Sequence, residues 1–277
     1  MKLTEIRKIL ANYDLQLTKS LGQNFLHDAN QLQRIAAAAE LNAADKVLEV
    51  GPGLGPLTEI LLAHAGEVLA IETDHRFATI LEGRFEGNPK LQLIVADALA
   101  WIRHEQRDWT GWKLVANLPY SVASPILVEL ALAARPPERL TVTLQLEVAR
   151  RVAARADDDD YGILTLLVQL AFEPGALFKI PPECFFPVPN VDSACLTLHR
   201  RATPLLPLTL TPTFTRIAKR AFSQRRKMMH KLLRTEWPVE KLNPAFDQLG
   251  ISPQARAETV SLHQFVELTR RLAPPPS

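Results

Sequence analysis

The segment Asn117-Leu118-Pro119-Tyr120 combines residue types that could position an aromatic amine for reaction. A purine amine is a weak nucleophile. Two acceptors, the Asn117 amide oxygen and a backbone carbonyl, would orient its lone pair toward an electrophilic methyl group. Proline fixes the turn that presents the carbonyl, and the Tyr120 ring offers a surface for stacking a base. Such positioning can supply much of a rate enhancement. The alternative interpretation is a plain Asn-x-Pro turn without a ligand.

A glycine-rich loop lies upstream, where Gly51, Gly53 and Gly55 follow the apolar run Val47 to Val50. Glycine tolerates positive φ and has no Cβ, so the backbone can turn sharply and approach a ligand closely. The third glycine comes too early for the dinucleotide fingerprint, and no Lys-Ser/Thr pair follows to indicate a phosphate loop. The loop alone leaves a ligand-free structural turn open.

Two carboxylates stand where the next apolar runs end, Glu72 after Ala70-Ile71 and Asp97 after Val95-Ala96. An acid at the first position can accept hydrogen bonds from both hydroxyls of a ribose, and one at the second can accept from an adenine amino group. Each acid could instead cap the following helix. Their occurrence at consecutive strand ends favours an adenosine-containing cofactor.

These residues require a scaffold of alternating strands and helices. The short apolar runs predict buried parallel strands, and helical patterns lie between them. The alternation predicts a doubly wound α/β sheet, with residues 161–172 and 193–198 extending the pattern and Asp157 to Asp160 forming an exposed loop. The expected strands are 47–50, 68–71, 91–95, 114–116 and 140–144, and the expected helices include 56–65 and 75–82.

Charge is distributed unevenly along the 277 residues. Residues 1–200 hold 19 Lys and Arg against 25 Asp and Glu, whereas residues 201–277 hold 13 against 5. Eight cations and no acid lie between Arg216 and Arg234. Such a field attracts a polyanion, so the pattern favours a nucleic-acid partner over an ordinary solvated helix face, in which acids are normally mixed with bases.

Three prolines within residues 201–212 indicate a stiff linker. We therefore expect a catalytic domain over residues 1–200 and a basic domain over residues 201–277, for which the charge pattern favours nucleic-acid binding and the resemblance described below implies RNA binding. Helical spacing over 213–233 and 262–272, with Pro212 and Pro253 near helix starts, predicts that the second domain is all helical.

Several classes of protein and site are excluded by the sequence. No apolar run approaches the roughly 20 residues that cross a bilayer, and no secretory leader is recognisable, so we expect a cytoplasmic protein. Cys184 and Cys195 lack the spacing of metal ligands and are expected to be reduced thiols. A monomer without a metal site is the default expectation.

The motifs together resemble the ribosomal RNA adenine dimethyltransferase family over nearly the whole chain. The resemblance implies a doubly wound α/β fold with a Rossmann-like sheet, which binds S-adenosyl-L-methionine as the methyl donor, and a small C-terminal all-helical domain. It further implies N6,N6-dimethylation of two adjacent adenines in a hairpin loop near the 3′ end of 16S rRNA, within the immature small ribosomal subunit. It rests on Lys19 to Leu26, the glycine loop, Glu72, Asp97, Asn117 to Tyr120, Tyr161-Gly162, Phe185 to Ser193 and Gln224 to Lys227.

Site residues are carried over by their matching positions. The resemblance implies a flipped adenine held between the rings of Tyr120 and Phe185. Base extrusion is cheapest in an unpaired loop. The implied cofactor residues are Asn24, Leu26, Gly51, Gly53, Glu72, Asp97 and Asn117; the implied target pocket is Asn117, Leu118, Pro119, Tyr120 and Phe185; the RNA-binding residues are Arg225, Arg226 and Lys227.

Two positions depart from the family's pattern. Leu146 stands where a lysine is usual, which puts a borrowed RNA contact in doubt, and Ser121 stands where asparagine commonly follows the tyrosine. The rival enzyme is the related family that methylates a large-subunit rRNA adenine, whose motif usually has Ile at the Leu118 position. DNA adenine methyltransferases fit the motif less well. A non-catalytic ribosome assembly factor is the alternative from another class.

Overall fold

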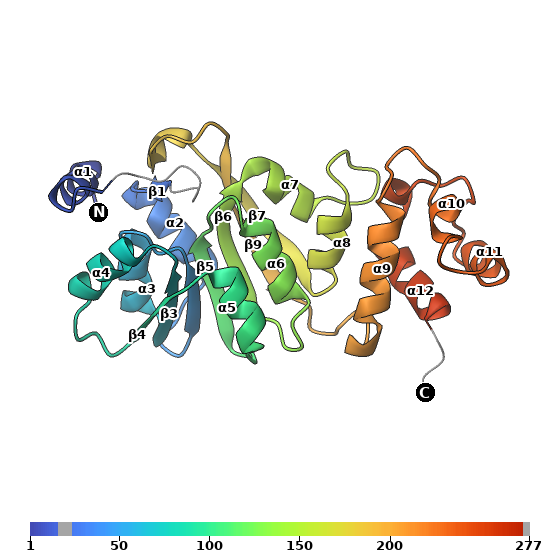
Figure 1. The fold of residues 1–277 in the computed structure, drawn as a ribbon, viewed down its shortest axis with the longest axis horizontal. Helices are drawn as coiled ribbons and strands as arrows, with labels where there is room; N and C mark the ends of the chain where they lie inside the picture. Colours follow the sequence, from blue (N-terminus) through green and yellow to red (C-terminus); the bar gives the residue numbers. More distant parts are fainter. Residues whose placement is uncertain (16–23, 274–277) are drawn as a thin grey trace. The chain divides into compact units, whose positions relative to one another are not determined.

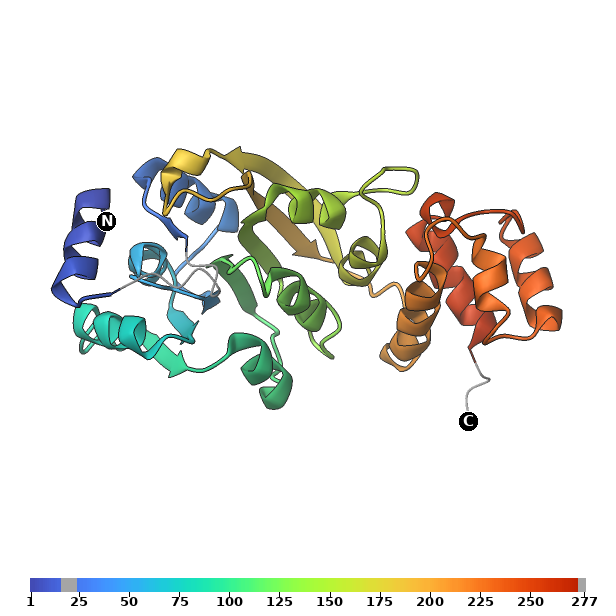
Figure 2. The same cartoon turned by 45° about the horizontal axis from the view of Figure 1, so that its top comes forward.

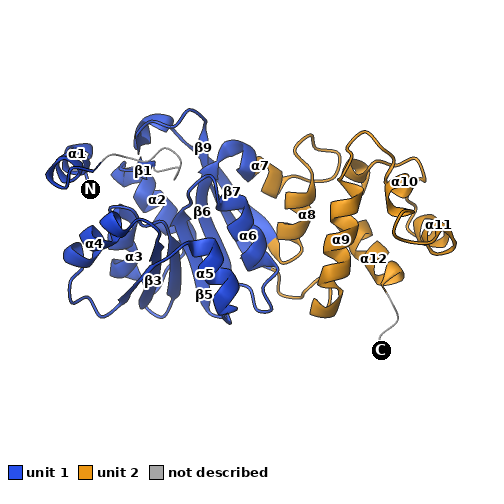
Figure 3. Ribbon diagram, viewed as in Figure 1, with its two compact units in different colours: residues 1–149, 173–200 blue, residues 150–172, 201–277 orange. Residues whose placement is uncertain are grey.

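The computed structural model describes residues 1–15 and 24–273. Their contacts divide into two compact units, one formed by residues 1–149 and 173–200 and the other by residues 150–172 and 201–277 (Figure 3). One division coincides with the boundary expected after Arg200. Residues 150–172, however, group with the C-terminal unit. Within the described residues, no helix has the length and apolarity needed to span a bilayer.

The first unit is built on a seven-stranded sheet with the order β4-β3-β2-β5-β6-β9-β7. Strands β2 to β6 pair in parallel, and β9 pairs antiparallel to β6. The predicted doubly wound α/β class is confirmed. In the turned view of Figure 2, the yellow and orange strands continue the sheet beyond the green ones. The strands are β2 (Lys46–Val50), β3 (Glu67–Glu72), β4 (Leu91–Val95), β5 (Trp112–Asn117), β6 (Arg139–Gln145), β7 (Phe172–Ile180) and β9 (Ser193–Arg200).

Helices cover both faces of the sheet (Figure 1). Because parallel crossovers are right-handed, the outward steps from β2 to β3 to β4 place α3 and α4 on one face. The return to β5 and the step to β6 place α5 and α6 on the other. The helices are α1 (Leu3–Asn12), α2 (Ala29–Ala39), α3 (Pro56–His64), α4 (His75–Arg84), α5 (Ala98–Glu105), α6 (Ala123–Ala131) and α7 (Leu146–Ala153), the last crossing the boundary between the units.

Burial explains why these runs form strands. In β2 every residue after Lys46 is buried, and β5 is buried from Trp112 to Ala116, as a central parallel strand with helices on both faces requires. Strand β4 differs from the expectation of full burial, because it is the edge strand and Val95 is exposed.

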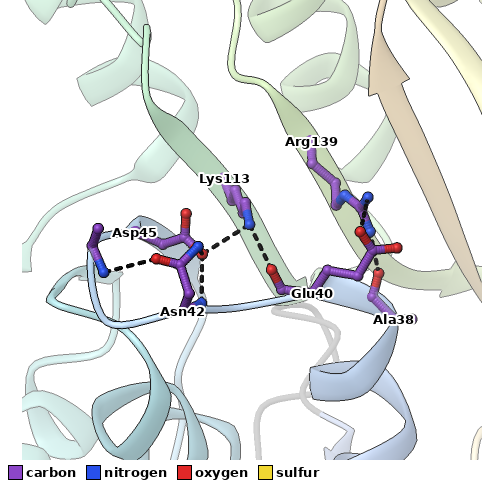
Figure 4. Close-up of polar contacts among 7 residues, drawn as sticks. Ala38, Glu40, Asn42, Asp45, Lys113 and Arg139 are labelled. Atoms are coloured by element: carbon purple, nitrogen blue, oxygen red, sulfur yellow. Dashed lines mark hydrogen bonds and ion pairs between the residues drawn. The ribbon is translucent and has the colours of Figure 1, made fainter.

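A polar cluster fixes α2 at the edge where the parallel strands begin (Figure 4). Lys113 of β5 is nearly buried, and its Nζ donates to the Glu40 carbonyl at 2.7 Å and to Asp45 Oδ2 at 2.8 Å. Arg139 of β6 donates to the Ala38 carbonyl at 2.9 Å and to the Glu40 carboxylate at 2.6 Å. Cations thus satisfy carbonyls at the C-terminal end of α2, where the helix dipole favours positive charge.

A two-stranded sheet lies beside the main one. Strand β1 (Phe25–Leu26) pairs antiparallel with β8 (Phe185–Phe186), which follows the 3-10 turn η2 (Pro182–Cys184). Leu26 is paired with Phe185, and both side chains are buried in one apolar cluster that also holds Cys184 and Cys195. Both cysteines are free.

The second unit is helical, apart from the first residue of β7. Its core contains Phe214, Phe246 and Phe265, and Tyr161 donates a buried hydrogen bond of 2.9 Å to the Val260 carbonyl. Its elements are α8 (Ile163–Gln169), η3 (Leu208–Leu210), α9 (Thr211–Ala221), α10 (Met229–Leu233), α11 (Val239–Gln248), η4 (Ala257–Thr259) and α12 (Leu262–Leu272). The helical pattern expected over 213–233 is therefore interrupted at residues 222–228.

Candidate active site

A cavity opens at the carboxyl ends of the parallel strands, beside β2, where the strand order reverses. Open α/β sheets bind ligands at such a switch point. Its wall comes from β1, the glycine loop, and the ends of β3, β4 and β5. It is lined by Asn24, Phe25, Leu26, Leu32, Glu49 to Gly53, Pro56, Leu57, Ile71, Glu72, Thr73, Phe77, Ala96 to Leu99 and Asn117 to Val122.

The glycine loop packs directly on the Asn-Leu-Pro-Tyr turn. Gly51 and Gly53 have φ values of 68° and 60°, in the left-handed region that favours glycine. A Cβ on Gly51 would lie 3.1 Å from the Pro119 ring, and one on Gly53 would lie 2.7 Å from the Phe25 ring. The two motifs predicted to form one site therefore share one cavity, and a side chain at Gly51 would press against the Pro119 ring.

Glu72 is held in place by the backbone around it. One carboxylate oxygen accepts from Gly53 N at 3.0 Å, and the other accepts from Asp74 N at 2.9 Å. Burial raises the pKa of Glu72, while these backbone donors oppose the shift. A carboxylate has about four acceptor sites, more than the backbone donors around Glu72 occupy, so it can still accept from a ligand hydroxyl in the cavity.

Asp97 performs the helix-capping role and also lines the cavity. Its carboxylate accepts from Ala100 N at 2.7 Å and caps α5, while the exposed side chain remains at the cavity wall. The two interpretations of this acid are therefore compatible.

Asn117 is anchored on one side and unpaired on the other. Its Nδ2 donates to the Asn24 carbonyl at 2.9 Å, which orients the amide. Its Oδ1 is buried and has no hydrogen-bond partner among the described residues. A buried acceptor without a partner is costly, so this oxygen is prepared for a donor that a ligand brings.

Tyr120 is held by Ser193, for which the sequence predicted no individual role. Its hydroxyl lies 2.5 Å from the hydroxyl of Ser193, a fully buried residue at the start of β9. Burial raises the pKa of Tyr120, opposed by Ser193, so the phenol stays protonated at neutral pH. The bond joins the Asn-Leu-Pro-Tyr turn to the end of the proline-rich segment.

Phe185 occupies a different environment from the other expected pocket residues. Only 1% of it is exposed, and it packs in the apolar cluster with Leu26 instead of lining the cavity. The aromatic rings on the cavity wall, besides Tyr120, are Phe25 and Phe77, with ring centroids 5.4 Å apart and nearly perpendicular planes. In the sequence, neither phenylalanine carried a signal of its own that separates it from a core residue.

Glu49 is the functional candidate that sequence reasoning missed. It lies in β2, is 1% exposed, lines the cavity, and its Oε2 has no partner among the described residues. Burial raises its pKa to about 8, helped by the negative charge of Glu72 and opposed by the Thr58 hydroxyl. The sequence did contain a signal for Glu49, because an acidic residue within an apolar strand run is unusual.

The remaining predicted positions lie elsewhere. Arg225, Arg226 and Lys227 are exposed between α9 and α10, and Arg225 donates to the Asp159 carbonyl at 3.0 Å within the second unit. Leu146 is buried, whereas Ser121 is exposed at the cavity wall. Residues 19–23 of the N-terminal motif lie outside the described residues. No cluster of potential metal ligands is present in the described part of the chain.

Comparisons with known proteins agree with one another. The family model described as ribosomal RNA adenine dimethylase matches residues 15–274. A Clostridium perfringens protein named ribosomal RNA small subunit methyltransferase A is 39% identical over 265 residues, covering 95% of this chain and 93% of the relative. A protein of the same name from Geobacter sulfurreducens is 37% identical, covering 93% and 96%.

Solved structures show the same fold. The 23S rRNA methyltransferase ErmE superposes with a TM-score of 0.69 at 31% identity, covering 90% of this chain and 99% of ErmE. A dimethyladenosine transferase from Plasmodium falciparum gives a TM-score of 0.73 at 24% identity, covering 88% and 95%. The second likeness is evidence for the fold alone.

Proposed function

The chain belongs to the ribosomal RNA adenine dimethylase family, and we propose that it transfers methyl groups from S-adenosyl-L-methionine to N6 of two adjacent adenines in a hairpin loop near the 3′ end of 16S rRNA. The observation that carries this proposal is the buried, unpaired Oδ1 of Asn117, in the cavity shared with the glycine loop. A purine amine is the kind of donor that this oxygen lacks.

The cavity residues fit the cofactor by the chemistry of their donors and acceptors. Glu72 would accept from the ribose hydroxyls and Asp97 from the adenine amine, while Gly51 and Gly53 allow the backbone to approach the ligand closely. Asn24, Leu26 and Asn117 complete the wall. When bound, the cofactor supplies the electrophilic methyl group on a sulfonium.

The protein's part in methyl transfer is orientation. Asn117 Oδ1 and a backbone carbonyl of the Leu118-Pro119 turn would accept from the two amine hydrogens, which aims the nitrogen lone pair at the methyl. Tyr120 would stack on the extruded adenine, an interaction worth about 1–3 kcal/mol. Phe185 would complete the target pocket only if the β1–β8 pair moves, because its ring is buried in the present arrangement.

RNA capture is assigned to the basic second unit. Arg225, Arg226 and Lys227 are exposed and can contact phosphates. We propose that the substrate is the immature small ribosomal subunit, and that the protein acts as a monomer in the cytoplasm during subunit maturation.

The decisive experiment measures transfer of labelled methyl groups to immature small subunits, followed by mass mapping of the modified adenines. The wild type should label two adjacent adenines. Asn117→Ala should lower the rate by roughly a hundredfold or more, as expected when a reacting group is misplaced. The matched control is Asn88→Ala, which changes an asparagine at the other end of the sheet and should retain full activity.

Two outcomes would contradict the proposal. Labelling of a large-subunit adenine instead would favour the second candidate, to which the likeness to ErmE points; Leu118 and the basic segment argue for the small subunit. Absence of labelling by the wild type, with subunit binding intact, would favour a non-catalytic assembly factor.

A further inference from the structure

Four consecutive acids and three consecutive cations lie side by side in the second unit. Residues 157–160, here the acidic loop, are all aspartate, and residues 225–227, here the basic connection, are Arg-Arg-Lys. The three cations are exposed, as are the first three acids. Arg225 Nη2 donates to the Asp159 carbonyl at 3.0 Å. A cation assigned to RNA binding is thus directed at the acidic loop.

An aromatic contact shows independently that the two segments are neighbours. Tyr161 directly follows the acidic loop, and Phe222 ends α9 shortly before the basic connection. Their ring centroids are 6.0 Å apart, and Phe222 in turn stacks on Phe265 of α12. The start of α8 therefore lies beside the end of α9, and both charged segments lie at that end of the helix pair (Figure 1).

The acidic loop has a defined conformation that does not depend on most of its charges. The Asp158 carboxylate accepts from Arg155 N at 2.7 Å, and Tyr161 N donates to the Asp158 carbonyl at 3.0 Å. Asp157 N donates to the Glu258 carbonyl, also at 3.0 Å. These bonds use backbone groups and the carboxylate of Asp158. The other three side chains of the loop can therefore be changed without removing these bonds.

The acids reduce the attraction that the basic connection exerts on a polyanion. Arg225 is hydrogen-bonded to the backbone of Asp159, so the opposite charges of these two residues lie within a Debye length of each other, about 8 Å at physiological salt. Four carboxylates stand beside three cations, which gives the two segments together a net charge of −1. A nucleic acid drawn to the cations therefore meets like charges next to them.

This juxtaposition affects different RNA shapes differently. Regular duplex RNA presents phosphates at even intervals along both strands and is recognised by its shape and backbone. A duplex backbone that crosses the basic connection would bring further phosphates toward the acidic loop, where they are repelled. A folded RNA surface whose backbone changes direction at that point can contact the cations without approaching the acids. Repulsive elements of this kind commonly set the specificity of binding.

From these observations we propose that Asp157, Asp159 and Asp160 are specificity-determining residues for the RNA substrate. They repel nucleic acid whose backbone continues past the basic connection, and so restrict Arg225 and its two neighbours to an RNA surface that turns away from the acidic loop. The proposal rests on the proposed function, because it takes the RNA of the immature small subunit as the partner.

The test replaces Asp157, Asp159 and Asp160 together with asparagine in the full-length protein. Asp158 is kept because its carboxylate caps the loop, and asparagine suits position 157, whose φ is 73°. Affinity for a regular RNA duplex of unrelated sequence should rise roughly tenfold at low salt, and the gain should shrink as salt is raised, because exposed charges are screened. Affinity for immature small subunits should change much less, so the ratio of the two affinities falls.

Two control variants separate local repulsion from net charge. Glu82→Gln, Glu86→Gln and Asp247→Asn together remove three exposed acids outside both segments, and should leave the ratio of subunit affinity to duplex affinity as in the wild type. In the second control, the three asparagine substitutions are combined with glutamine at residues 225–227. The gain in duplex affinity should then disappear, because it depends on the cations beside the loop.

The outcomes are separable. An unchanged duplex affinity, an equal gain for duplex and subunit, or an equal gain in the first control would overturn the role of the acidic loop. Loss of subunit binding with duplex binding unchanged would also overturn it, and would assign the loop to a basic protein partner. The proposed function has its own readout, because it fails only if the wild type does not transfer labelled methyl groups to immature small subunits. Thermal unfolding should show that the asparagine variant is as stable as the wild type.

Discussion

The 2.5 Å contact between the Tyr120 and Ser193 hydroxyls separates two roles of the tyrosine, its ring and its hydroxyl group. Tyr120→Phe keeps the stacking surface and should retain methyl transfer within about tenfold. It leaves the Ser193 hydroxyl buried and unpaired, at a cost of about 1–3 kcal/mol in the free energy of unfolding. Urea denaturation and a labelled-methyl assay measure the two effects.

Tyr120→Ala provides the contrast. It removes the ring, so transfer to RNA should fall by roughly ten- to a hundredfold, the equivalent of the stacking energy. The control, Tyr13→Phe, changes an exposed tyrosine and should alter neither stability nor rate. If Tyr120→Phe reduced activity as much as Tyr120→Ala, the hydroxyl would be required for the reaction and stacking alone would be insufficient.

Sequence patterns located single residues well where a motif has a fixed backbone geometry. The glycine loop and the Asn-Leu-Pro-Tyr turn meet as expected, because both follow central parallel strands whose carboxyl ends share one edge. Burial was harder to predict. Glu49 lies in an apolar strand run and Phe185 in a proline-rich segment, yet Phe185 packs in the core and Glu49 reaches the cavity. Neighbouring strands far away in sequence decide which side chains are covered.

At the scale of elements, the cluster that fastens α2 to β5 and β6 should contribute to stability more than to activity. Lys113→Met would leave the Asp45 carboxylate and the Glu40 carbonyl without their cation. The cost of breaking such a nearly buried pair is about 3 kcal/mol. Thermal or urea unfolding should show the destabilisation, while the methyl-transfer rate of the folded protein stays within about twofold, because the cluster lies at the edge of the sheet opposite the cavity.

A surface ion pair supplies the control for this change. Arg103 pairs with Glu129 at 2.8 Å, and more than half of the Arg103 side chain is exposed. Arg103→Met should cost less than about 1 kcal/mol, as is usual for exposed pairs. Equal destabilisation of both variants would show that the Lys113 cluster does not anchor α2.

The interrupted helix shows a limit of periodicity. Apolar residues continue at helical spacing through Met229 and Leu233, so the pattern predicted one helix beyond residue 221. In the structure the Ser223 hydroxyl donates to the Arg220 carbonyl at 2.8 Å, a local bond that competes with continuation of the helix. The consecutive cations Arg225, Arg226 and Lys227 then lie in the connection, where their mutual repulsion is relieved by solvent.

At the scale of the whole molecule, replacing Arg225, Arg226 and Lys227 together with glutamine tests the origin of RNA affinity. Binding to immature small subunits should weaken, and the slope of log affinity against log salt should become shallower by roughly 0.7–0.9 for each phosphate that the protein no longer neutralises. Cofactor affinity should stay unchanged, because the cavity is lined entirely by residues of the first unit.

The control uses other cations of the same unit. Arg270 and Arg271 on α12 are paired with Glu267, so replacing both with glutamine should change the salt slope little. An unchanged slope in the triple variant would remove residues 225–227 from the RNA interface, and an equal change in the control would indicate a general effect of net charge.

The division of the chain into two units could be predicted only in part from the sequence. Proline content marked the boundary after Arg200, because proline stiffens the chain locally. The grouping of residues 150–172 with the C-terminal unit depends on Tyr161 meeting Val260 and Phe222, contacts between residues far apart in the chain that no local pattern encodes.

This discontinuous second unit also has a consequence for biosynthesis. Residues 150–172 are synthesised roughly ninety residues before Val260, an interval of about 4–18 seconds at ~5–20 residues per second. While the roughly forty residues between α8 and α9 are being made, α8 lacks its partner helix α9, and its hydrogen bonds within the second unit include those of Thr165 and Gln169 to residues 151–154. A chaperone that binds short apolar segments of nascent chains would therefore bind this protein at α8, midway through translation.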